Sequence, residues 1–287
     1  MNYHERKQAY KRKKRKRNSL IAITLFLIIL PLIAVLYQPY LYYIKDPQIV
    51  DSVLTEAKTV EHSDISSNKD YIESMQNKVE ASTHSQESEV DTASQIEQPN
   101  DYIYSLENEK AKEIYEETGI TYDFEQVDFI SAIPEDVTLN RNLLRGQILM
   151  PDVDMNLPIV EGVSNENLYT GASTMKPDQE MGVGNYALAG HLVPSQDLLF
   201  SPLKRAEQGM NIYVSNMDQV YTYTVARTFE VDPTSIEVIS DEQGDGLLTL
   251  VTCSNLEGDG RLIVQAELTN QQHINEIDQD LYNQFME

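Results

Sequence analysis

One long apolar run near the N-terminus stands out in the hydropathy pattern. Residues 20–37 are apolar apart from Thr24 and Pro31. A helix of this length covers roughly 27 Å, close to the hydrocarbon thickness of a bilayer, and one proline is tolerated in such a helix. The pattern predicts a transmembrane signal anchor over residues 19–44. A cleaved signal peptide is the alternative, but no small-residue cleavage site follows the run.

The next segment is polar and has no clear period. Residues 45–100 are rich in Ser, Glu, Asp, Gln and Asn, with scattered Val and Ile. A segment with so few apolar side chains buries too little surface to offset the entropy lost on ordering. We therefore expect an acidic, flexible stalk over residues 45–100. Apolar residues then return at helical spacing (Ile103, Leu106 and Ile114), which predicts a helical lead-in over residues 101–127.

From about residue 128 the pattern changes to short runs rich in β-branched and aromatic residues, separated by glycine and proline. The candidate strands are Gln147–Met150, Leu157–Val160, Tyr186–Leu192, Asn211–Ser215, Val220–Val231, Leu247–Cys253 and Leu262–Leu268. So many strands without long helices between them favour a closed or nearly closed, antiparallel-rich β-barrel over a parallel α/β sheet. The predicted barrel domain covers residues 128–270 and belongs to the mainly β class.

The helical candidates around this barrel are short. They lie near Asn165–Tyr169 and Pro202–Gln208. The C-terminal tail, residues 271–287, has Ile274, Ile277, Leu281 and Phe285 at spacings that fit one face of a helix. The polar residues between them suit an exposed tail equally well.

Charge divides the chain sharply. Residues 1–18, a basic tail, hold nine Lys and Arg against one acid, and the rest of the chain holds 13 Lys and Arg against 45 Asp and Glu, a net charge of −32. A basic cluster before an apolar span places the N-terminus in the cytoplasm and the acidic remainder outside the cell. A body this acidic is repelled by polyanions, so we expect no nucleic-acid partner.

Three residues carry the candidate chemistry. The chain has one cysteine, Cys253, at the end of the predicted strand Leu247–Cys253, so no intramolecular disulfide forms. His191 is the one histidine inside the predicted barrel, and Arg261 follows the turn-forming Gly-Asp-Gly after the cysteine. Taken singly, each has a plain alternative: an inert buried thiol, a structural histidine and a surface cation.

Together, these segments resemble the sortase family, membrane-anchored cysteine transpeptidases of Gram-positive bacteria. The resemblance rests on the Thr-Leu-Val-Thr-Cys sequence that ends at Cys253, the Ala-Gly-His segment that ends at His191, and the downstream Arg261. It extends over about residues 128–269. An N-terminal anchor without a C-terminal span is similar to the class A, housekeeping group.

The resemblance implies a mixed β-barrel of about eight strands and a specific reaction. Family members cleave a Leu-Pro-x-Thr-Gly signal of surface proteins between Thr and Gly, and transfer the acyl group to an amine of a peptidoglycan precursor. It implies that Cys253 is the nucleophile, that His191 is the general acid and base, and that Arg261 stabilises the oxyanion or holds the substrate backbone carbonyls. A pilin-polymerising sortase that uses a lysine amine, and an inactive wall-binding module, are the alternatives.

Small or apolar residues flank these three. Ala189, Thr249, Val251 and Thr252 suit a groove for the Leu-Pro part of a signal, and a place in the barrel core suits them equally.

No cofactor or metal is expected. Some class A sortases bind calcium through acidic residues before the catalytic histidine and in a later loop. Here the first stretch offers only Asp178 and Glu180, beside the cation Lys176, which is too few ligands for calcium. Acidic residues of the later loop, Glu237, Asp241 and Glu242, fit a solvated surface more simply. We therefore predict activity that does not depend on calcium.

Overall fold

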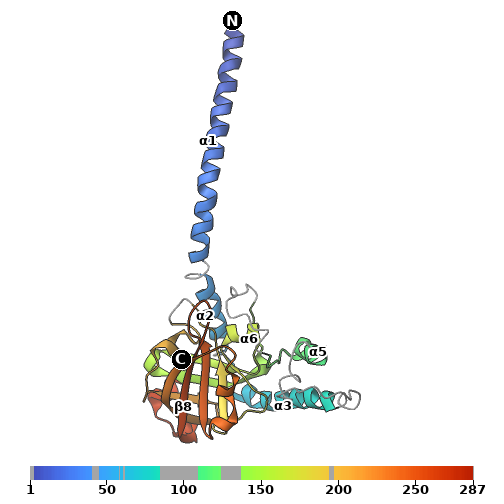
Figure 1. The fold of residues 1–287 in the computed structure, drawn as a ribbon, viewed down its shortest axis with the longest axis vertical. Helices are drawn as coiled ribbons and strands as arrows, with labels where there is room; N and C mark the ends of the chain where they lie inside the picture. The colour runs from blue at the N-terminus through green and yellow to red at the C-terminus, as the bar shows by residue number, and fades with distance from the viewer. Residues whose placement is uncertain are drawn as a thin grey trace. The chain divides into compact units, whose positions relative to one another are not determined.

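The computed structural model describes residues 3–40, 45–57, 59–60, 62–84, 109–123, 137–193 and 197–286. They divide into two compact units, Met1–Asp46 and Pro47–Glu287. The first unit contains the single helix α1 (Tyr3–Tyr40), whose segment Lys11–Tyr37 is long and apolar enough to cross a membrane (Figure 1). The apolar side chains of this segment that the structure describes are exposed, which fits the predicted anchor.

The second unit is built on a closed barrel of eight strands, as predicted. The strands are β1 (Leu144–Met150), β2 (Met155–Val160), β3 (Ala172–Thr174), β4 (Asn185–Ala189), β5 (Asn211–Ser215), β6 (Gln219–Val231), β7 (Leu247–Cys253) and β8 (Arg261–His273). Their order around the barrel is β1-β2-β3-β4-β7-β8-β6-β5. The β2–β3 and β4–β7 pairs are parallel and the other pairs are antiparallel. Strand β3 is the one that the sequence pattern missed.

Strands β4 and β7 are buried on both faces. Alternate residues such as Leu188 and Leu250 join the cluster inside the barrel, and the residues between them, such as Ala189 and Val251, join a second cluster outside it. Burial on both faces explains why apolar residues occur at consecutive positions of these two strands instead of alternating with exposed polar residues. The outer cluster continues into the segment between β6 and β7 through Ile239.

The prediction of a flexible stalk is wrong for most of residues 45–84. They form helices α2 (Asp46–Ala57) and α3 (His62–His84), which belong to the barrel unit (Figure 1). Val50 and Ile72 are fully buried and Val53 nearly so. Each helix carries a narrow apolar stripe on an otherwise polar surface, and average composition hides such a stripe. The rest of the predicted stalk, residues 85–100, lies outside the described residues.

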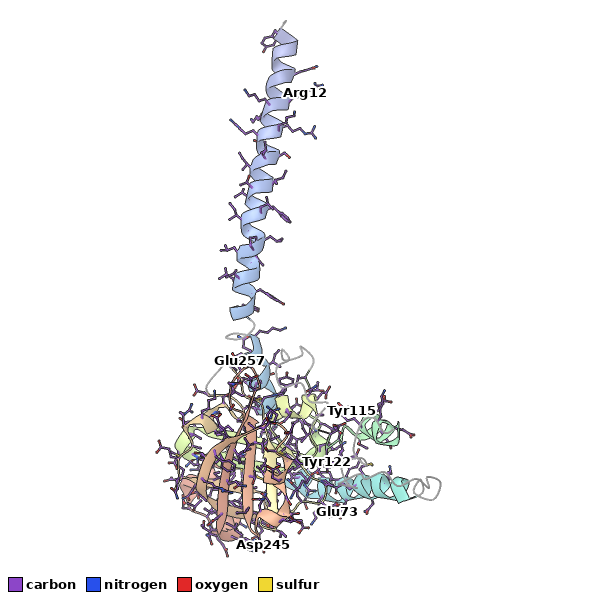
Figure 2. The ribbon with its side chains drawn as sticks, viewed as in Figure 1. Arg12, Glu73, Tyr115, Tyr122, Asp245 and Glu257 are labelled. Atoms are coloured by element: carbon purple, nitrogen blue, oxygen red, sulfur yellow. The ribbon has the colours of Figure 1, made fainter. Side chains whose placement is uncertain are left out.

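A buried polar cluster joins α3 to the barrel. Glu161, which is 1% exposed, accepts hydrogen bonds from Tyr122 and Gln76, and Tyr122 is labelled in Figure 2. Its other carboxylate oxygen lies 3.2 Å from Nε of Arg145. Asn68 of α3 donates to the backbone oxygens of residues 141 and 144 at 2.6 and 3.1 Å. These contacts span more than 70 positions of sequence, so α3 and the barrel fold as one structure.

Short helices complete this unit. The predicted lead-in contains α5 (Glu109–Thr118), and the helical candidate near residue 165 is α6 (Asn165–Thr170). The candidate near residue 202 is a short 3-10 helix, η5 (Ser201–Arg205).

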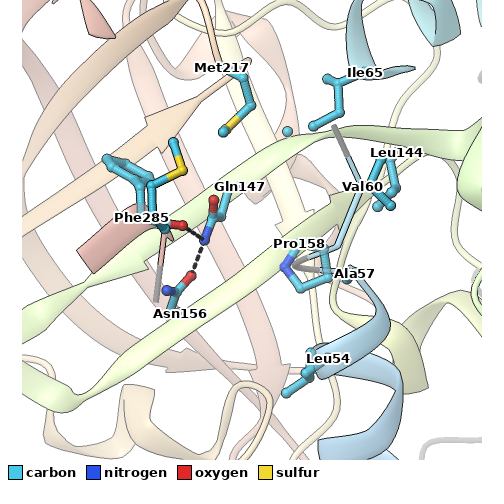
Figure 3. A pocket seen from close by; sticks show the side chains of 12 residues that line it. Leu54, Ala57, Val60, Ile65, Leu144, Gln147, Asn156, Pro158, Met217 and Phe285 are labelled. Carbon is cyan, nitrogen blue, oxygen red and sulfur yellow. Dashed lines mark hydrogen bonds between the residues drawn. The ribbon is translucent and has the colours of Figure 1, made fainter. Parts of the chain in front are cut away.

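The C-terminal tail contains a packed helix, which is the first of its two predicted alternatives. Helix α7 (Gln279–Met286) buries Leu281 and Phe285 against the barrel. The side chains of Gln147 and Asn156 donate to the backbone oxygens of Phe285 and Gln284 at 3.0 and 2.8 Å, and Figure 3 shows the first of these bonds. A largely apolar pocket lies here between α2, β1, β2 and α7, and none of the predicted site residues line it.

Candidate active site

The three candidate residues lie at or just beyond the ends of the neighbouring strands β4, β7 and β8. In the parallel β4–β7 pair Ala189 is opposite Val251, so His191 and Cys253 each lie two positions beyond a paired residue. In the antiparallel β7–β8 pair Cys253 is opposite Arg261. Side chains two positions apart point to the same face of a sheet. The register therefore places Cys253 and Arg261 side by side on the outer face, and His191 follows two residues after the end of β4 at the same edge of the sheet.

The hairpin between β7 and β8 holds Arg261 beside the sulfur. Nη1 of Arg261 lies 3.9 Å from Sγ of Cys253 and donates to the backbone oxygens of Gly258 and Gly260 at 3.0 and 3.2 Å. The turn backbone thus fixes the guanidinium, and little side-chain freedom remains to be lost on binding a substrate. Cys253 is 2% exposed, and burial raises the pKa of its thiol above the ordinary value while the Arg261 charge acts in the opposite direction.

His191 is held from two sides. Its ring lies with its centroid 4.4 Å from that of Tyr169 in α6, tilted by 35°. Its backbone oxygen accepts a hydrogen bond from Phe200 at 3.1 Å. A side chain at Gly190 would meet the ring of Phe200 at 2.4 Å, so only glycine fits before this histidine. The sequence did not identify Tyr169 as a site residue, because an aromatic residue in a short helix usually belongs to the hydrophobic core.

Three of the four predicted groove residues lie on the same face as Cys253. Ala189 and Val251 form, with Ile263 of β8, an apolar row directly below the row of the candidate residues. Thr249 lies one row lower. Thr252 points to the inner face of β7, because side chains alternate along a strand. Its neighbours there belong to the barrel core, so we no longer assign Thr252 to the groove.

An ion pair joins the two loops that were considered, and rejected, as a calcium site. Nζ of Lys176 lies 2.6 Å from Oδ1 of Asp241. Partial burial acts to raise the pKa of Asp241, but hydrogen bonds from Lys176 and from the backbone nitrogen of Asn185 hold it below the ordinary value. Among the residues that the structure describes, no group of three or more His, Cys, Asp or Glu is placed to hold a metal ion.

Known proteins resemble this chain in sequence. A sequence model of the sortase domain matches residues 148–269. Sortase A of Streptococcus agalactiae is 41% identical over 196 residues, which cover 66% of this chain and 79% of that protein. Sortase A of Listeria monocytogenes is 36% identical over 170 residues, covering 57% and 76%. The crystal structure of the Listeria enzyme covers 50% of this chain and 97% of its own, with 34% identity and a TM-score of 0.46.

Proposed function

Because the chain belongs to the sortase family of cysteine transpeptidases, we propose that it cleaves a Leu-Pro-x-Thr-Gly-type signal between Thr and Gly and transfers the acyl group to an amine of a cell-wall precursor. The observation that supports the proposal is the pairing of Cys253 with Arg261 at the end of β7, with His191 two residues past the end of the neighbouring strand β4.

In the first step, the Cys253 thiolate attacks the scissile carbonyl carbon. The C–N bond then breaks, His191 as imidazolium gives its proton to the leaving glycine amine, and a thioester remains on Cys253. In the second step neutral His191 takes a proton from the incoming amine, which attacks the thioester and restores the thiolate. Each proton taken up by His191 is returned, so the cycle closes without a further reactant.

Arg261 supplies the fixed positive charge. Its guanidinium lies beside the sulfur, where negative charge moves from the thiolate to the carbonyl oxygen. A planar, preorganised donor stabilises that oxygen in the transition state. Burial raises the pKa of the Cys253 thiol, so a smaller fraction of the free enzyme carries a thiolate near neutral pH than it would with an exposed cysteine.

Peptide turnover tests the proposal. The full chain in detergent micelles is mixed with a Leu-Pro-x-Thr-Gly peptide and hydroxylamine, and products are identified by mass spectrometry. We expect a hydroxamate of the fragment that ends in threonine, together with the free glycine fragment. An intact peptide, after confirmation that the protein is folded, would favour the inactive wall-binding module.

We also propose that α1 anchors the protein with its N-terminus in the cytoplasm, because the basic residues precede the apolar span. Protease added to wall-stripped cells should therefore digest the barrel unit or release it from the membrane. The control is lysed cells, in which both sides are accessible. Protection of the whole chain in intact cells would mean the opposite orientation.

Replacing Arg261 with lysine should lower kcat/KM about 100-fold. Lysine keeps the charge but not the planar fork, so it does not bind the turn carbonyls and face the sulfur at once. Arg141→Lys is the matched control, since Arg141 forms an exposed pair with Glu56. Kinetics of R261K equal to those of the control would remove Arg261 from the reaction.

Calcium should leave activity within about twofold of the value in chelator, because the Lys176 ammonium already neutralises Asp241. Initial rates are measured first with chelator and then with millimolar calcium, with magnesium as the control for ionic strength. Saturable activation by several-fold, specific to calcium, would contradict this prediction.

A further inference from the structure

The segment between β6 and β7, residues 232–246, covers the apolar row below Cys253. It contains the 3-10 helices η6 (Ile236–Ile239) and η7 (Asp241–Gln243). Ile239, which is 7% exposed, packs in the same cluster as Ala189 and Val251, and Val238 packs against that cluster. This segment therefore forms a wall that packs over the apolar row next to the candidate active site.

A single buried side chain bonds to this wall at two points. Asn185, the first residue of β4, is 0% exposed. Its Nδ2 donates to the backbone oxygen of Val238 at 2.9 Å and to that of Ser240 at 3.2 Å. These two residues flank Ile239, so holding both carbonyls fixes the direction in which the Ile239 side chain points.

The orientation of the Asn185 amide is itself determined. Its Oδ1 accepts a hydrogen bond from the hydroxyl of Thr249 at 2.7 Å. That hydroxyl accepts in turn from Nε2 of Gln265 at 3.2 Å. Both amide donors and the amide oxygen are thus engaged, and a flipped amide would place its oxygen against two carbonyls.

We propose that Asn185 is a positioning residue that sets the substrate-facing wall of the groove, and that it thereby controls recognition of the apolar part of the signal peptide. The proposal rests on the function proposed above. Asn185 lies three rows below the row of Cys253 on the same face, so it is too far from the sulfur to take part in the reaction. Its loss should therefore affect peptide binding and leave the chemical step unchanged.

Other contacts support the wall without replacing this one. Gln265 reaches the Val238 oxygen only at 3.4 Å, and the Lys176–Asp241 pair lies beyond Ser240 on a partly exposed carboxylate. Without the Asn185 donors, the carbonyls on both sides of Ile239 lose their closest side-chain partner. The Val238 oxygen would keep only the long bond from Gln265, and the Ser240 oxygen only the bond from the backbone nitrogen of Gln243 at 3.2 Å. We therefore expect the wall to move toward other partners, such as water.

Asn185→Asp tests the proposal in the full-length protein in micelles. The carboxylate keeps the size and the acceptor for Thr249 but removes both donors. At saturating hydroxylamine we expect KM for the peptide to rise about tenfold while kcat stays within about twofold. Amide hydrogen exchange should become faster between Ile236 and Gly244 and remain unchanged in β7.

Two further variants complete the design. Thr249→Val removes the hydroxyl that orients the amide without adding charge, and it should raise KM about threefold even if N185D fails to fold. Asp232→Asn is the matched control: Asp232 caps the exposed start of the same segment through Thr234, and we expect wild-type KM.

An unchanged KM in both N185D and T249V, or a fall in kcat with no change in KM, would overturn the proposal. Failure of the wild type to turn over the peptide would instead refute the proposed function. Hydrogen exchange would still decide whether Asn185 holds the wall.

Discussion

Replacing Cys253 with alanine should abolish turnover and leave the barrel folded. The proposed reaction passes through a bond to the sulfur, and the chain has no second thiol to replace it. Loss of one buried sulfur at the end of β7 should cost only about 1 kcal/mol and lower Tm by about 2–4 °C. We therefore expect a normal folded spectrum with no acyl adduct and no hydroxamate.

The same variant gives a clean labelling experiment. Iodoacetamide should add once to the wild type and not at all to C253A, since Cys253 is the one cysteine. Because burial raises the pKa of the thiol, alkylation should increase with pH and have a midpoint above that of a free thiol. Ser254→Ala, one residue further on, is the matched control. Hydroxamate production by C253A would exclude Cys253 as the nucleophile.

Deleting residues 1–84 should unfold the barrel at physiological temperature. This deletion removes α2 and α3, with Val50, Val53 and Ile72 in their buried positions. Burial of three such side chains contributes about 6 kcal/mol, which is comparable with the whole stability of a typical domain. It also leaves Glu161 without its hydrogen bond from Gln76. Thermal unfolding followed by circular dichroism measures the loss.

The matched control is a fragment that lacks only residues 1–44. It keeps both helices and should unfold at the temperature of the full chain. Within α3, Gln76→Leu should destabilise the protein, whereas Lys69→Ala, at an exposed position, should not. If residues 85–287 were as stable as residues 45–287, α2 and α3 would be accessory to the barrel.

The sequence predicts the barrel because strand signals are local. The sequence pattern predicts seven of the eight strands. It does not predict β3, because three residues are too few to establish a period. Helices α2 and α3 are not predicted for a different reason. Their buried faces are narrow, and the partners of Asn68 lie more than 70 positions away.

The candidate site also contains residues that the sequence predicts and residues that it does not. Cys253, His191 and Arg261 stand in sequence segments whose resemblance to a family is specific, although each alone has a bland alternative. Asn185 and Tyr169 have no such segment around them. Their roles depend on which carbonyl or ring lies opposite in three dimensions, and nothing in local residue types carries that information.

The parallel pairing of β4 with β7 also has a consequence for folding kinetics. The two strands lie about 60 residues apart, and β1 and β5 are similarly distant, so closing the barrel needs two long-range pairings and should take milliseconds to seconds instead of microseconds. Until β4 and β7 pair, apolar side chains on both faces of these two strands, such as Leu188 and Val251, lack their native partners. A chain exported unfolded would therefore pass through an aggregation-prone stage outside the cell, before His191 and Cys253 first meet.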